Sequence, residues 1–92
     1  MDITTANMTG LSLVMDAMGL ASAAGLGLIF GNLRYAASRF EMIPDDVDFS
    51  LVSALSTARS LAYESDAAPA LIALIDEALD TAWTLDTDEF AP

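Results

Sequence analysis

The sequence predicts an all-α protein, a small helical bundle folded as one domain. Its 92 residues are enough for one small domain and no more. Along the chain, apolar residues recur at helical spacing, and no segment alternates apolar and polar residues with the two-residue period of a strand. No linker-like segment divides the chain. We therefore expect one long Gly/Ala-rich apolar helical segment followed by two shorter amphipathic helices.

The first segment, residues 1–43, is apolar and nearly free of charge. Between Ile3 and Leu33 the only charged residue is Asp16. One helix over residues 5–41, straight or mildly kinked, is the favoured interpretation. The alternative is a hairpin, because glycine weakens a helix interior and several glycines cluster near its middle. Polar side chains suited to N-cap the first helix lie close to the N-terminus: Thr4, Thr5 and Asn7.

Within a continuous first helix, four small residues would follow one another at four-residue spacing. Such a ridge allows two helix backbones to approach closely, in lipid or in water. We therefore predict a helix-packing interface made by Gly19, Ala23, Gly27 and Gly31. The uncharged run at residues 17–33 also has the minimum length of a membrane-spanning helix, so a single-pass membrane subunit is an alternative.

Residues 44–84 are predicted to form an acidic pair of helices. Pro44 ends the first segment and favours extended backbone at Ile43. Asp48 or Ser50 is expected to cap a second helix, at about residues 50–63. The apolar face of this helix holds Leu51, Val52, Leu55, Ala58 and Ala62.

The third predicted helix, at about residues 67–84, is the most clearly amphipathic. Ser65 or Asp66 is expected to cap it, and proline at position 69 is tolerated in a first turn. One face carries an apolar anchor for a core or a partner: Leu71, Ile75, Leu79 and Trp83. The opposite face carries acids that could meet a partner: Asp76, Glu77 and Asp80. Residues 85–92 are expected to form an acidic, disordered tail.

The charge distribution limits the possible functions. Residues 1–40 have no net charge, whereas residues 41–92 hold twelve acids against Arg59 and account for the net charge of −11. Direct nucleic-acid binding is not expected, because three arginines cannot offset this charge beside phosphates. The chain has no Cys, His or Lys, so the usual general bases, nucleophiles and soft-metal ligands are missing. The aspartates at 45, 46 and 48 are interpreted as turn and cap residues, and the tail acids as solvated. We expect no catalytic site, no cofactor and no metal.

The sequence therefore favours a non-catalytic, acidic interaction or structural subunit that self-associates or binds a protein partner. A membrane subunit spanning residues 17–33 is the first alternative. The second is an acidic inhibitor that occupies the basic, nucleic-acid-binding surface of another protein. Small acidic helical proteins of viruses and mobile elements often act in these ways. A cytoplasmic or virion location is therefore expected in preference to a membrane.

Overall fold

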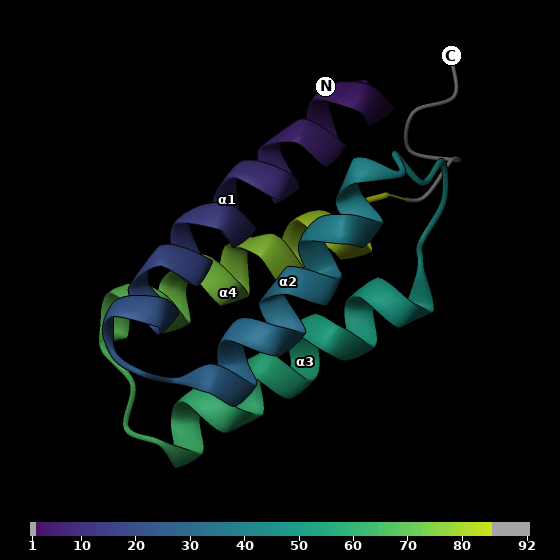
Figure 1. Ribbon diagram of the computed structural model, residues 1–92. Helices are drawn as coiled ribbons and strands as arrows, with labels where there is room; N and C mark the ends of the chain where they lie inside the picture. The colour runs from purple at the N-terminus through teal and green to yellow at the C-terminus, as the bar shows by residue number, and fades with distance from the viewer. Residues whose placement is uncertain (1, 86–92) are drawn as a thin grey trace.

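Residues 2–85, the part of the chain described by the computed structural model, form four helices and no strand (Figure 1). The helices are α1 (Ile3–Ala23), α2 (Gly27–Glu41), α3 (Phe49–Glu64) and α4 (Pro69–Trp83). Each packs against the next along the chain, and α4 also packs against α1. The bundle measures 43 × 19 × 18 Å. The predicted all-α fold is confirmed.

Because successive helices alternate in direction, three chain segments meet at one end of the bundle. There α2 ends, α3 begins and α4 ends, close to the start of α1 (Figure 1). We call this the acidic end, because it holds Asp2, Glu41, Asp45, Asp46, Asp48 and Asp80. At the opposite end, the α1–α2 and α3–α4 turns carry Glu64 and Asp66.

The first segment is a helical hairpin, so the favoured prediction of one continuous helix was wrong. Gly25 has φ +71°, in the left-handed region that glycine adopts without a Cβ penalty. Its N–H donates to Ser22 O (3.1 Å), and the Leu26 N–H donates to Ala21 O (2.9 Å). These two bonds form a Schellman motif, which ends α1 and lets α2 begin at Gly27.

The two helices of this hairpin approach closely at Gly10. A Cβ atom at this position would lie 2.3 Å from the ring of Phe40, which is 1% exposed. The buried residues of α1 are mostly small: Ala6, Asn7, Gly10, Val14, Ala17 and Ala21. Small residues on α1 therefore leave the space that the Phe40 ring fills.

Asn7 does not cap α1; it fastens the helix to the α2–α3 loop. Its buried Nδ2 donates to Ile3 O in α1 (2.9 Å) and to Pro44 O in the loop (3.0 Å). Its Oδ1 accepts no hydrogen bond within residues 2–85. The N-cap of α1 is instead Asp2, whose Oδ1 accepts from the Thr5 N–H (2.7 Å).

Ile43 does not adopt the extended backbone that the following proline favours. Its φ is 50°, and its N–H donates to Phe40 O (3.0 Å) as α2 ends. A β-branched residue in the left-handed region is strained. The closing turn of α2 therefore outweighs the local preference imposed by Pro44.

The second hairpin follows the predicted helices closely, and one of its two caps agrees with an expected residue. Asp48, one of the two residues considered as the cap of α3, caps it, with Oδ1 accepting from the N–H groups of Ser50 (2.9 Å) and Leu51 (3.2 Å). The predicted cap of α4 was wrong. Ser65 and Asp66 (φ 52°) belong to the turn that ends α3, and α4 begins at Pro69 after Ala68, which makes no side-chain cap bond.

The core lies along the bundle axis and takes residues from all four helices. The predicted apolar face of α3 is buried there as expected: Leu51, Val52, Leu55, Ala58 and Ala62. Leu85, which the sequence placed in the acidic tail, is fully buried and extends the core beyond α4. The rest of the predicted tail, with Asp86, Asp88 and Glu89, lies outside the described residues.

Candidate functional site

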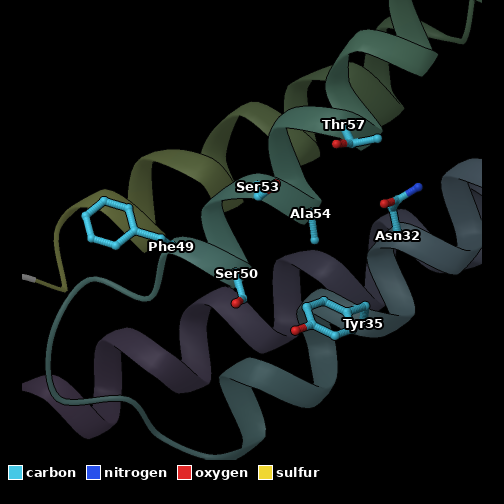
Figure 2. Close-up of a pocket in the computed structure, with 7 residues that line it drawn as sticks. All are labelled: Asn32, Tyr35, Phe49, Ser50, Ser53, Ala54 and Thr57. Carbon is cyan, nitrogen blue, oxygen red and sulfur yellow. The ribbon is translucent and has the colours of Figure 1, made fainter.

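An open groove runs between α2 and α3, with a volume of about 470 Å³. Its lining is polar and aromatic: Asn32, Tyr35, Phe49, Ser50, Ser53, Ala54 and Thr57. Figure 2 shows the Tyr35 ring beside Ala54, with its hydroxyl turned toward the Ser50 end of the groove. These lining side chains can stack and can form hydrogen bonds, and none of them is an acid or base near neutral pH.

Two exposed aromatic residues meet where this groove reaches the acidic end. The rings of Phe49 and Trp83 make an edge-to-face pair with centroids 6.4 Å apart. Phe49 is 73% exposed and Trp83 is 51% exposed. Met42, at the end of α2, is also exposed at 68%. Large apolar surface is therefore open to solvent at the end of the molecule where carboxylates gather.

At the same end of the bundle, an ion pair joins α2 to the start of α3. Arg39 Nε donates to Asp48 Oδ2 (2.7 Å), and a second guanidinium nitrogen lies 2.6 Å from the same oxygen. Burial raises the pKa of Asp48, but the hydrogen bonds from Arg39 and from the Leu51 and Ser50 N–H groups outweigh burial and lower it. Asp48 thus caps α3 with one oxygen and holds α2 with the other.

A second ion pair crosses from α3 to α4. Arg59 Nε lies 2.5 Å from Asp76 Oδ1, and the Arg59 guanidinium carbon lies 5.4 Å from the centroid of the Tyr63 ring. Asp76, followed by Tyr63, raises the pKa of Arg59, which stays charged. Both carboxylate and guanidinium are substantially exposed, so the pair contributes little to stability.

The predicted acidic face of α4 is divided by this pairing. Asp76 is half-buried and bound to Arg59, whereas Glu77 and Asp80 are exposed. Asp80 lies one turn before Trp83 on the same helix. Glu77 and Asp80 are therefore the members of that face that are open to a partner.

The predicted apolar anchor is divided as well. Leu71 and Ile75 are in the core, and Leu79 is partly buried against it. Trp83 lies outside and pairs with Phe49. Sequence reasoning did not identify Phe49 as a surface residue, and its neighbours Leu51 and Val52 in the first turn of α3 are buried, so position alone gave no signal.

The predicted small-residue ridge is not continuous, because the turn after Ala23 separates its halves. Gly19 and Ala23 lie on α1, and Gly27 and Gly31 lie on α2. All four are exposed, and a Cβ on any of the three glycines would meet nothing within 4 Å. They make no close packing inside the bundle, and their role between molecules stays a prediction.

Residues 2–85 contain neither a metal-binding cluster nor a helix able to cross a membrane. No group of three or more acidic side chains in this part of the chain is arranged to hold a metal ion. None of its helices combines the length and hydrophobicity that a membrane crossing requires. The span considered at residues 17–33 is interrupted by the turn at Gly25.

Comparisons with protein-family models, with curated proteins and with solved structures found no match to this chain.

Proposed function

We propose that this protein is a non-catalytic, acidic interaction subunit that binds a protein partner through its acidic end. The observation that carries the proposal is the exposed Phe49–Trp83 pair beside a concentration of carboxylates. Tryptophan is enriched among the residues that dominate binding energy at interfaces. Singly exposed apolar residues are ordinary, whereas contiguous apolar surface marks interaction sites as its area grows, and Met42 is exposed at the same end.

The chemistry of the site selects a partner that is basic and partly apolar. Arginine suits both features, because its guanidinium stacks on aromatic rings and pairs with carboxylates. Asp80 on α4 and Asp46 in the α2–α3 loop supply exposed carboxylates at this end. The groove beside Tyr35 would extend the contact with hydrogen bonds from hydroxyl groups.

Trp83 provides the test, because it is the only tryptophan in the chain. An amphipathic peptide of Arg and Leu is titrated while Trp83 fluorescence is recorded, and a matched peptide with Glu in place of Arg is the control. We expect saturable binding of the basic peptide only, weakening as salt rises. Phe49→Ala should reduce the affinity at least tenfold. Tyr63→Ala, which removes an exposed aromatic from the other end of α3, should leave it unchanged.

Equal binding of both peptides, or an unchanged affinity in Phe49→Ala, would contradict the proposal. If the folded protein does not bind the basic peptide at all, the proposal is contradicted as well.

The inhibitor of a nucleic-acid-binding protein is a second candidate. Two of the three arginines, Arg39 and Arg59, form ion pairs with Asp48 and Asp76. Exposed acids such as Glu77 and Asp80 therefore face solvent without a basic partner in these pairs, and this favours binding to a basic surface. The test is competition: the protein should displace a DNA duplex from a basic DNA-binding protein, and the double variant Glu77→Gln/Asp80→Asn should displace it less well. Equal displacement by the variant would exclude these carboxylates as the mimic of phosphates.

A further inference from the structure

A second cavity continues the groove between α2 and α3 toward the opposite end of the bundle. Its volume is about 230 Å³, and its apolar lining comes from the start of α2 and the end of α3: Leu26, Leu28, Ile29 and Leu61. On α3, residues that line the two cavities follow one another at spacings of three or four: Ser50, Ser53, Thr57, Leu61 and Ser65. Residues at this spacing share one face of a helix, so both cavities lie along the same edge of the bundle. We call the two cavities together the α2–α3 valley.

The valley exposes large apolar side chains and carries no charge along its length. Leu28 (75% exposed) lies in the far cavity, and Tyr35 (47%) and Phe49 (73%) lie in the groove. None of the described residues that line either cavity is acidic or basic. The edge between α3 and α4, by contrast, is bridged by the Arg59–Asp76 ion pair. Contiguous exposed apolar surface of this kind marks an interaction site.

Acids flank the valley at both ends. Asp46 and Asp80 are exposed at the acidic end. At the opposite end, Glu64 and Asp66 are exposed on either side of Ser65, which lines the far cavity. A second copy of a chain with net charge −11 would bring acids against these acids, so charge argues against a copy as the occupant. The charges favour a segment that is basic near its ends and uncharged between them.

We propose that the α2–α3 valley binds one amphipathic helix of a protein partner, with a basic residue at the acidic end and an aliphatic residue in the far cavity. This inference rests on the proposed function and specifies the form of its partner. A helix suits the valley because a helix satisfies its own backbone hydrogen bonds, and the valley offers no strand edge to an extended segment. The small side chains of Ser50, Ser53 and Ala54 on α3 allow a partner helix to lie close.

The length of the valley determines the spacing of the two anchoring residues on the partner. Phe49 and Leu61 are twelve residues apart on α3, which corresponds to about 18 Å. On a partner helix lying along α3, residues eleven apart are separated by about 16 Å and share one face, because eleven residues make about three turns. Residues nine apart lie on opposite faces, because nine residues make about two and a half turns. We therefore expect an Arg and a Leu eleven residues apart.

Calorimetric titration of the whole chain with helical peptides of Ala and Gln tests this geometry. Two peptides carry Arg and Leu eleven residues apart, one for each order along the peptide, and two controls of the same composition carry them nine apart. At least one of the first two should bind at least fivefold more tightly than both controls. A proline at the centre of that peptide should remove its advantage, because proline breaks a helix.

Paired variants of the protein test whether the peptide lies in the valley. Leu28→Ala should remove the preference for the eleven-residue spacing, whereas Leu20→Ala, which shortens an exposed leucine on α1, should retain it. Ser53→Lys should weaken binding of the preferred peptide at least fivefold, because it places a long charged side chain in the groove. Ser56→Lys adds the same charge at an exposed position of α3 outside the lining and should weaken binding less. Circular dichroism verifies that each variant is folded.

Equal affinity for the two spacings, or equal effects of Ser53→Lys and Ser56→Lys, would overturn the inference. Full affinity with the central proline would assign the valley to an extended segment instead. A dimer in sedimentation equilibrium that Leu28→Ala dissociates would assign it to a second copy. Binding that requires Phe49 but is insensitive to spacing would overturn this inference and leave the proposed function intact. Absence of binding to every basic peptide would contradict both.

Discussion

The first hairpin of this bundle differs from the second mainly in α1. In the second hairpin, both helices bury Leu or Ile side chains together with several alanines. In the first hairpin, α2 likewise buries Ile29, Leu33 and Phe40, whereas α1 buries mostly Ala, Asn and Gly and exposes Met8 and Met15. A helix whose small residues face inward can approach its neighbours closely, and its large apolar residues then remain outside. The comparison indicates that close approach holds the first hairpin and that regular amphipathic faces hold the second.

The largest effect is expected where the two hairpins differ most, at Phe40. Phe40→Ala should lower the free energy of unfolding by about 3–5 kcal/mol, because it empties the space beside Gly10. Phe49→Ala, at the exposed start of α3, should cost less than about 1.5 kcal/mol, mainly through the lost pair with Trp83. Urea unfolding followed by circular dichroism measures both. Similar losses in the two variants would remove the distinction between the hairpins.

Gly10 tests the close approach from the other side. Gly10→Ala should destabilise the protein by roughly 1–3 kcal/mol, because the added Cβ overlaps the buried Phe40 ring. Gly31→Ala, on the exposed face of α2 with open space around it, should stabilise by about 0.5–1 kcal/mol. Thermal unfolding of the pair should give shifts of opposite sign. A gain in stability in both variants would show that the ring moves aside freely.

The join between the hairpins depends on Asp48. Asp48→Asn keeps a capping oxygen on α3 but removes the charge that binds Arg39, and should cost about 1–2 kcal/mol at neutral pH. Because the folded protein lowers the pKa of Asp48, this contribution is complete above the unfolded value near 3.8 and is lost as pH falls through the lower folded value. The difference between wild type and variant should therefore vanish in strong acid. A difference that persists there would assign the loss to packing.

The smallest effect is expected at Ile43, where α2 ends. Ile43→Asn should raise the free energy of unfolding by up to about 1 kcal/mol, because asparagine tolerates the left-handed backbone that strains isoleucine. Gly25 also lies in the left-handed region, with φ +71°, but glycine is not strained there, so no gain is expected from replacing it. A lower melting temperature in Ile43→Asn would mean that the half-exposed isoleucine side chain contributes more than the strain costs.

The extent of prediction from sequence differed between the hairpins for a physical reason. Repeated apolar residues at helical spacing define one buried face, so α3 and the part of α4 that carries Leu71 and Ile75 could be predicted. In α1, small and apolar residues occupy most of the circumference, and no such face stands out. In α2 a buried face of Ile29, Leu33 and Phe40 does exist, but the sequence analysis joined α2 to α1 and did not recognise it. The turn at Gly25 was one of two open interpretations, and the groove beside Tyr35 was not foreseen. Both depend on how helices distant in sequence pack.

The amino-acid sequence by itself determined the helical class, the nearly charge-free first segment, the acidic second segment and a helix start at Asp48 or Ser50, because these follow from local composition and spacing. Tertiary structure decided the rest. It broke the first segment at Gly25, placed Gly10 against Phe40, buried Leu85 and left Trp83 beside Phe49 on the surface. These outcomes depend on which surfaces meet once four helices close into a bundle, and that choice minimises the exposed apolar area of the whole chain, not of any one segment.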